Sequence, residues 1–388
     1  MIKSVHVENF KSLVDFSAEL TELTVFIGNN SSGKSTVLQA IQFICESIRS
    51  DYDVILQKRN WSVENIRSKF SESKKIVFGI TFELMDEKGQ IYTFKWDTEI
   101  MAFTSKNEMY LDSESVKVDD DTLLEYKHGK KYLLALNGAE ADEEGSLYNV
   151  LKFHSSVMKN IRKSKDLDPR LVLLMNHIDK VMSFELLTPE KMRLSSRGTT
   201  DVIEASGKNL PSFIKRMSGS QKESFMKKIG WLLDGSVVDV DTETKGQPGW
   251  TQIKVLEKYS DKNVSITSKE MSDGMLRLVA FVAIGEMQAD NATYLLDEIE
   301  NGINLLYVER LTKLFSDMAK EKKTQIILTT HSTLFMDYFA SDSIIKLERN
   351  KYGETIAEKI FEDEELKQQL EYMYPGEIIL NMSSEINE

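Results

Sequence analysis

Apolar and polar side chains alternate along several segments in the first part of the chain. Residues 2–7 follow this pattern, and residues 75–84 and 90–96 follow it again on either side of the polar turn 86–89. Because successive side chains of a strand point to opposite faces, period-two alternation predicts strands with one buried face. The two later segments therefore predict a hairpin. Further alternating segments appear near residues 115–118 and 131–134.

Polar runs separate these strand segments. Residues 8–12 predict a turn, and the acidic stretches 119–121 and 140–144 predict solvated turns. Residues 50–75 are polar and mixed, and they favour no particular element.

Helical spacing replaces alternation from about residue 147 to 235. Apolar positions share one helical face within residues 171–182 and again within 213–233. Neither stretch keeps a heptad register for the three or four heptads that a coiled coil needs. We therefore predict a compact helical insertion, after which residues 237–240 and 252–255 return to strand patterns.

Short, fully apolar segments followed by helical spacing predict an α/β core. Residues 23–27 precede the helical pattern 37–44, and residues 294–296 and 325–328 are separated by a predicted crossover helix at about 305–320. A hairpin over 343–361 and an acidic helical tail should follow. The expected parts of the chain are 1–145, an N-terminal lobe with an antiparallel β subdomain; 146–235, the helical insertion; and 236–388, a C-terminal lobe.

Composition narrows the class of protein. The 388 residues carry a net charge of −13, from 62 acidic and 49 basic residues, which argues against a surface coated with nucleic acid. No segment approaches the roughly 18 consecutive apolar residues that a membrane helix needs. The N-terminus lacks a secretory apolar core, and Cys45, the single cysteine, falls in the apolar pattern of the first helix. We expect a cytoplasmic protein with no membrane segment.

A phosphate-binding loop follows the first apolar strand. Glycine, four residues, then glycine, lysine and serine is the Walker A pattern, and it lies here between a predicted strand and a predicted helix. The glycines let backbone N–H groups converge on phosphate oxygens, and the helix N-terminus adds partial positive charge. Lys34 should reach the β- and γ-phosphates of ATP, and the Ser35 hydroxyl should ligate Mg²⁺. The residues expected to bind nucleotide are Asn29, Asn30, Ser31, Ser32, Gly33, Lys34, Ser35 and Thr36.

Three more motifs follow residue 270. Ser272 and Gly274 form a turn that opens an apolar helix, which suits an anion. Asp297 ends an apolar strand, where it can hold Mg²⁺ beside Ser35, and Glu298 follows it, where it can polarise an attacking water. His331 follows the next apolar strand, 34 residues after Asp297, and can contact the γ-phosphate or orient the water.

Each of these motifs alone has a simpler structural explanation. A Ser-Asp-Gly turn is common, a strand often ends in acidic surface residues, and a lone histidine after a strand is usually structural. In a parallel sheet, however, the ends of both strands open on the same edge as the phosphate-binding loop. Their occurrence together favours one active site.

The four motifs, in this order, resemble the ABC-type ATPase heads, and within them the RecF-like and OLD-like AAA-family ATPases related to SMC heads. The opening segment resembles the family's first strand and its Asn-Phe-Arg/Lys-Ser turn, which implies that Lys11 lies near the nucleotide. The turn at 272 precedes Asp297 by 25 residues, a spacing similar to that from ABC signature to Walker B. The resemblance implies a P-loop fold and a head-to-tail homodimer in which Ser272 and Gly274 close the ATP bound at Lys34 of the other subunit.

The chain also departs from the family pattern. Asn304 stands where a histidine is common, and no glutamine is a confident Q-loop residue. We find no zinc hook and no long coiled coil, and the segment after His331 is too short for the Toprim domain of OLD proteins. Residues 207–210 resemble a further family element weakly.

Our leading hypothesis is an ATP-hydrolysing clamp or sensor that controls a separate effector in anti-phage defence. The alternative is a RecF- or SMC-like DNA-repair ATPase that grips DNA in an ATP-dependent way. A third hypothesis, a scaffold with negligible turnover, is disfavoured by Glu298 and His331, and a small-molecule kinase would leave the Ser-Asp-Gly turn without a purpose. The alternative relies on two basic clusters, namely Lys159, Arg162, Lys163 and Lys165, and Lys215, Arg216, Lys222, Lys227 and Lys228.

Overall fold

A computed structural model gives the fold of the chain and describes residues 1–119, 121–136, 139–142, 152–184, 187–244, 246, 248–287 and 289–385. It divides into two compact units. The first unit consists of Met1–Met182, Asn291–Thr293 and Ile345–Ile360, and the second of Ser183–Asp290, Tyr294–Ile344 and Phe361–Glu388. The expected helical part, residues 146–235, is shared between both units at the Met182 boundary.

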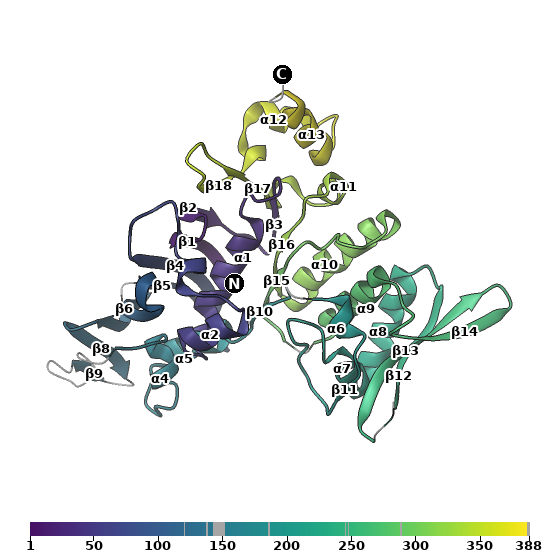
Figure 1. Ribbon diagram of the computed structural model, residues 1–388, viewed down its shortest axis with the longest axis horizontal. Coiled ribbons are helices and arrows are strands. Elements are labelled where there is room, and N and C mark those ends of the chain that lie inside the picture. Colours follow the sequence, from purple (N-terminus) through teal and green to yellow (C-terminus); the bar gives the residue numbers. More distant parts are fainter. Residues whose placement is uncertain are drawn as a thin grey trace. The chain divides into compact units, whose positions relative to one another are not determined.

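An eight-stranded antiparallel sheet forms much of the first unit, in the order β2-β1-β4-β5-β6-β7-β8-β9 (Figure 1). The predicted hairpin is confirmed, because β4 pairs with β5 along its whole length from Lys75↔Met101 to Met85↔Ile91. Its strands are β1 (Ile2–Phe10), β2 (Leu13–Glu19), β4 (Lys75–Met85), β5 (Ile91–Phe103), β6 (Glu108–Val118), β7 (Asp121–Lys127), β8 (Lys131–Leu136) and β9 (Ala139–Asp142).

The predicted turns need correction in three places. Residues 8–10 belong to β1, and the chain turns only at Lys11, whose φ is 52°. Asp119 turns with a φ of 50°, but Asp121 already begins β7, and Asp120 lies outside the described residues. Residues 140–142 belong to β9, while 143–144 lie outside the described part. Strands β2 and β7 escaped prediction because short half-buried strands carry few alternating positions.

Helices of the first unit pack aromatic side chains against this sheet. Phe43 lies in the unit's core, with its ring centroid 5.7 Å from that of Phe10 and 5.9 Å from that of Phe78. Cys45 is fully buried beside it, and burial raises the pKa of its thiol to about 12, as expected of a core residue. The helices are α1 (Lys34–Glu46), α2 (Tyr52–Lys58), α3 (Val63–Ile66), α4 (Val157–Ile161) and α5 (Pro169–Ile178).

A separate group of strands holds the phosphate-binding loop in the first unit. β3 (Leu23–Ile27) lies beside β17 (Ile344–Arg349), which pairs in antiparallel fashion with β18 (Thr355–Glu358). The hairpin predicted for 343–361 is therefore confirmed. β3 is buried from Thr24 onwards, and residues 29–31 of the loop that follows it are exposed.

The second unit combines helices with a small antiparallel sheet and two buried strands. The sheet contains β11 (Ser196–Arg197), β12 (Val237–Thr244), β13 (Trp250–Tyr259) and β14 (Lys262–Thr267). The buried neighbours β15 (Thr293–Leu296) and β16 (Gln325–Thr329) are joined through η3 (Leu305–Tyr307) and α10 (Val308–Lys322), which confirms the predicted crossover helix. The short strand β10 (Val181–Ser183) spans the boundary between the units.

Along the chain, helices precede and follow these strands of the second unit. Helix α9 is apolar almost throughout and buried from Leu278 to Gly285. The remaining helices are α6 (Pro189–Met192), α7 (Leu210–Arg216), α8 (Gly219–Leu232), α9 (Asp273–Gly285), α11 (Thr333–Met336), α12 (Glu364–Gln369) and α13 (Pro375–Glu385). Within the described residues, no helix has the length and apolar character needed to cross a membrane.

Candidate nucleotide site

The phosphate-binding loop adopts a backbone that only certain residues tolerate. Gly28 and Gly33 have φ angles of 144° and 109°, and Ser31 between them has a φ of 66°. A Cβ on Gly28 would lie 2.1 Å from the Leu347 carbonyl oxygen, and one on Gly33 would lie 2.3 Å from Thr355 Oγ1. Both glycines are therefore required by backbone conformation and by close packing.

The β17–β18 hairpin braces this loop from the other end of the sequence. Arg349 Nε donates a hydrogen bond to the Ser31 carbonyl at 2.8 Å. Thr355 Oγ1 lies 2.9 Å from the Ser32 carbonyl oxygen and 2.8 Å from Ser12 Oγ. These contacts hold the Ser31 and Ser32 carbonyls in place and so fix the backbone of the loop.

Lys34 and Ser32 fit a bound triphosphate. Lys34 is buried, and its Nζ donates to the Gly28 carbonyl at 2.8 Å and the Asn29 carbonyl at 3.0 Å. Ser32 Oγ is buried without a hydrogen-bond partner among the described residues, which is a costly arrangement that a phosphate oxygen would relieve. Asn29, Asn30 and Ser31 are exposed.

Ser35, Thr36 and Lys11 complete the part of the site that lies in the first unit. Ser35 and Thr36 are half-buried in the first turn of α1. Lys11 Nζ donates to Gln39 Oε1 of the same helix at 2.6 Å and lies 3.8 Å from the centroid of the Trp61 ring. Lys11 is therefore held beside the helix that follows the phosphate-binding loop.

The second unit brings Asp297 and Glu298 to the end of β16. Thr329 Oγ1 donates a hydrogen bond to Asp297 Oδ1 and accepts one from the Glu298 backbone N–H at 2.9 Å. The Ile299 N–H also bonds to the Thr329 carbonyl at 3.4 Å. The ends of β15 and β16 are therefore tied together by one buried threonine.

Glu298 has a left-handed backbone with a φ of 46°. A residue with a side chain in this region costs about 1–3 kcal/mol, and such positions cluster at active sites. Glu298 is half-buried, so its carboxylate is accessible at the tip of the strand. The strain favours a catalytic role over a chance acidic strand end.

His331 lies beside the same turn, through a residue that the sequence analysis left without a role. Its Nδ1 is 2.8 Å from Glu300 Oε1, and its backbone N–H donates to the same oxygen at 2.7 Å. Asp297, Glu298 and His331 are thereby gathered within one unit, as the parallel-strand argument predicts.

The signature turn contacts the loop that follows the acidic strand. Ser272 is exposed and caps α9 by accepting a hydrogen bond from the Met275 N–H at 3.2 Å. A Cβ on Gly274 would lie 2.3 Å from the Gly302 carbonyl oxygen, so the two backbones are in direct contact. The open N-terminus of this helix suits an anion supplied by another molecule.

Each half of the site is built within one unit, and the joining of both halves around one nucleotide stays a prediction. The proposed magnesium ligands, Ser35 and Asp297, belong to different units. Within the described residues, no group of three or more His, Cys, Asp or Glu side chains is arranged to hold a metal.

Thr329, Glu300 and Thr355 also contact the predicted site residues, and none of the three was predicted from the sequence. Thr329 and Glu300 each lie two residues from a predicted catalytic residue, and that proximity was the available signal. Thr355 lies more than 300 residues from the loop that it supports, and no local pattern points to it.

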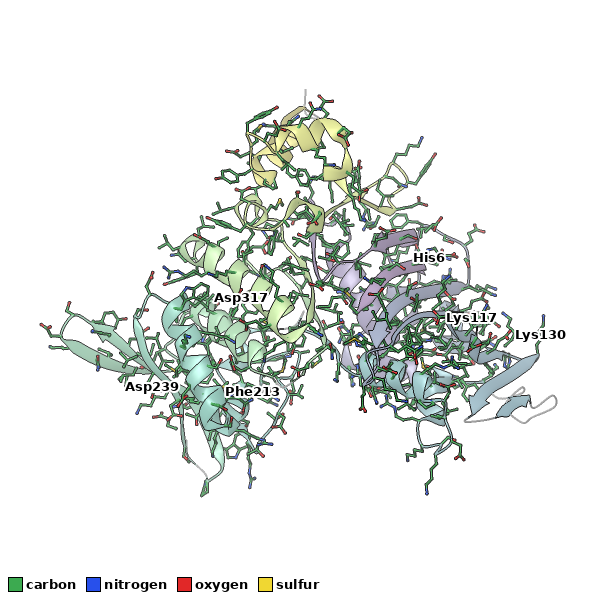
Figure 2. The ribbon with its side chains drawn as sticks, turned by 180° about the vertical axis from the view of Figure 1, so that it is seen from behind. His6, Lys117, Lys130, Phe213, Asp239 and Asp317 are labelled. Carbon is green, nitrogen blue, oxygen red and sulfur yellow. The ribbon has the colours of Figure 1, made fainter. Side chains whose placement is uncertain are left out.

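The other histidines have structural surroundings. His6 lies on β1 (Figure 2), with Nδ1 2.9 Å from Ser17 Oγ and Nε2 3.0 Å from Glu8 Oε1. His177 is buried in α5, and its ring packs edge-on against Phe82 at 5.7 Å. Neither is placed with the candidate catalytic groups of the second unit.

These features define an ABC-type P-loop ATPase head. The head combines a glycine-rich loop between strand and helix, an acidic strand end with a neighbouring histidine, and an antiparallel subdomain. The model of one protein family, AAA_21, described as "AAA domain, putative AbiEii toxin, Type IV TA system", matches residues 23–337. The chain belongs to this family. A curated relative from Helicobacter pylori, named ATP/GTP phosphatase, is 24% identical over 371 residues, covering 89% of each chain.

Solved SMC heads share this fold. An SMC head bound to the C-winged helix domain of ScpA matches with a TM-score of 0.52 and 16% identity, covering 92% of this chain and 96% of that one. The head domain with an extended coiled coil from Pyrococcus furiosus, bound to the C-terminal domain of ScpA, matches with a TM-score of 0.52 and 13% identity, covering 95% and 99%. The mixed α/β fold predicted from the sequence is confirmed.

Proposed function

We propose that this chain hydrolyses ATP as a head-to-tail homodimer and acts as a clamp or sensor that controls a separate effector. The observation that carries the proposal is the acidic strand end, where Thr329 bonds to both Asp297 and the strained Glu298. His331, which follows β16, contacts Glu300 two residues after Glu298. A left-handed glutamate costs about 1–3 kcal/mol, and such positions cluster at active sites.

In this mechanism, the chain's own residues bind, orient and exclude water. Lys34 and the loop N–H groups bind the β- and γ-phosphates. Glu298 accepts a proton from the attacking water, which His331 helps to orient. Mg²⁺, held by Ser35 and Asp297, would neutralise charge on the phosphate oxygens. Ser272 and Gly274 of the second copy close the site, so hydrolysis removes the ligand that both copies share.

The role in defence is supported by the family description, which names a toxin of a type IV toxin–antitoxin system. Partner proteins are also supported by the SMC heads of similar fold, which are bound to ScpA domains. Copurification with proteins encoded beside its gene is the direct test for an effector. A binary complex that depends on ATP would support the sensor function.

Three variants test hydrolysis and dimerisation. Lys34→Ala should lower turnover about 100-fold or more, because the phosphates lose a preorganised cation. Glu298→Gln should lower turnover by about 10²–10⁴ and accumulate an ATP-bound dimer in sizing experiments. Glu309→Gln, an exposed carboxylate at the start of α10, is the matched control and should behave as wild type.

If both the wild type and Glu298→Gln stay monomeric in sizing experiments with ATP, the proposed ATP-dependent dimer is refuted. Hydrolysis that survives Lys34→Ala would show that the phosphate-binding loop is not the site.

An ATP-dependent DNA grip is the second candidate, and one observation favours it. A cavity of about 530 Å³ in the second unit is lined by four lysines, by Asp317 and Glu321, and by Trp231, whose exposed ring a base can stack on. Against it, five of the nine residues in the two basic clusters pair with carboxylates. These pairs are Lys159–Asp51, Arg162–Asp179, Arg216–Asp201, Lys222–Asp241 and Lys228–Glu286.

Binding titrations test this candidate function. They use single-stranded and duplex DNA of fixed length at several salt concentrations, with and without ATP. A DNA grip requires affinity that falls steeply with salt and rises with ATP. Trp231→Ala should then weaken binding to single strands most. Absent or salt-independent binding would exclude it.

A further inference from the structure

Glu300 contacts His331 through two different groups of that residue. Its Oε1 accepts a hydrogen bond from the His331 backbone N–H at 2.7 Å and lies 2.8 Å from the ring Nδ1. The Glu300 side chain is only 10% exposed, whereas the His331 side chain is 52% exposed. A buried carboxylate therefore holds one edge of an accessible imidazole.

The second carboxylate oxygen of Glu300 indicates that the Glu300–His331 contact does not serve to stabilise the fold. Glu300 Oε2 is buried without a hydrogen-bond partner among the described residues. A buried unsatisfied acceptor costs about 1–3 kcal/mol, so a different side chain at this position would serve the fold better. Groups that break this rule are commonly retained for a site's chemistry.

The contact decides which ring nitrogen carries hydrogen. An ionised carboxylate only accepts hydrogen bonds, so the Nδ1 that faces Glu300 must be protonated. In the neutral ring, Nε2 on the opposite edge is then an acceptor. Among the described residues, no hydrogen-bond partner occupies Nε2.

We propose that Glu300 is a positioning residue that holds His331 as its Nδ1–H tautomer and so presents Nε2 as a hydrogen-bond acceptor. A neutral ring in this state accepts a hydrogen bond from the attacking water, whereas contact with a phosphate oxygen would need a proton on Nε2. The inference rests on the proposed role of His331 in hydrolysis and narrows that role to orienting water.

The test uses the full chain labelled with ¹⁵N-histidine, in long-range ¹H–¹⁵N spectra at a pH well above the ordinary histidine pKa of about 6.5. His331→Ala assigns the resonance among the five histidines of the chain. The wild type should show the Nδ1–H pattern. Glu300→Gln keeps an acceptor at Oε1 and should preserve it, whereas Glu300→Ala should redistribute the ring between both tautomers.

Steady-state hydrolysis supplies the second readout. Glu300→Ala should lower kcat about 10- to 100-fold, as loss of a ligand-orienting partner does elsewhere, with little change in the KM for ATP. Glu300→Gln should recover most of that loss, and the exposed Glu309→Ala should change neither quantity. A general structural defect would not separate the two Glu300 variants.

The outcomes separate this inference from the proposed function. A wild-type ring in the Nε2–H state, or an unchanged tautomer in Glu300→Ala, overturns the inference even if hydrolysis depends on Lys34. Hydrolysis that is independent of Lys34 overturns the proposed function, while the tautomer result still decides whether Glu300 positions the ring.

Discussion

Thr329 serves two catalytic candidates with a single hydroxyl group. It donates to the Asp297 carboxylate and accepts from the Glu298 N–H, and its side chain is fully buried. A carboxylate that carries a fixed hydrogen bond keeps one orientation, which a metal ligand requires. The residue therefore links the geometry of two strand ends to the chemistry proposed for them.

Thr329→Val should separate this role from simple packing. Valine fills a similar volume but leaves the Glu298 N–H unpaired, which costs about 1–3 kcal/mol in the free energy of unfolding. Turnover should fall about 10- to 100-fold because Asp297 and Glu298 lose their shared anchor. Phosphate release and urea unfolding measure the two effects. Thr329→Ser keeps the hydroxyl, and a serine variant as inactive as the valine variant would contradict the hydrogen-bond explanation.

At the scale of single elements, α5 contains a histidine that the folded chain keeps neutral. Burial lowers the pKa of His177 from 6.5 to about 3, and the positive charges of the Met1 amino group and Lys180 act in the same direction. Below the ordinary pKa the unfolded chain binds a proton that the folded chain rejects. Folding stability should therefore fall as the pH drops from 6.5 towards 3.

His177→Phe tests this linkage in the first unit. Between about pH 7.5 and about pH 5.5 the wild type should lose about 1.4 kcal/mol more unfolding free energy than the variant. Urea unfolding at both pH values measures the difference. Phenylalanine is aromatic like the imidazole that packs against Phe82, so the variant should fold. Equal losses in both proteins would show that other groups govern the acid sensitivity.

Gly274 at the start of α9 is held against the Gly302 carbonyl oxygen. Alanine normally favours a helix over glycine by about 1 kcal/mol, but here its Cβ would overlap backbone 2.3 Å away. Gly274→Ala in the Glu298→Gln background should therefore shift the turn and abolish the ATP-dependent dimer in sizing experiments. Gly285→Ala on the same helix meets only the flexible Met318 side chain, at 3.2 Å or more, and should leave the dimer intact.

Local signals account for what the sequence could predict. The strand–loop–helix at 23–44 carries a strong, contiguous pattern, and so do the two apolar strands and the crossover helix between them. All of these elements were predicted. The contacts of Thr355 with Ser32 and of Glu300 with His331 join residues that are distant in the sequence. Such contacts depend on the tertiary fold, and hydrophobic periodicity contains no information about them. The short strands β2 and β7 were found only in the structure because they carry few alternating positions.

At the scale of the whole molecule, the net charge of −13 bears on self-association. Two copies with the same excess of negative charge repel one another at long range, and salt screens that repulsion over about 10 Å at 0.1 M. Association of Glu298→Gln in ATP should therefore become faster as salt rises through the low range, as stopped-flow light scattering can measure. DNA binding would respond in the opposite direction. Association that slows with salt would indicate attractive charge pairs across the dimer interface.

The brace between the phosphate-binding loop and the β17–β18 hairpin also has a consequence for synthesis on the ribosome. Arg349 and Thr355, which hold Ser31 and Ser32, are translated more than 300 residues after the loop at 28–36. A nascent chain should therefore lack full nucleotide affinity until residue 355 has left the exit tunnel. Copies whose synthesis stops before residue 355 would then lack the nucleotide-dependent activity proposed above.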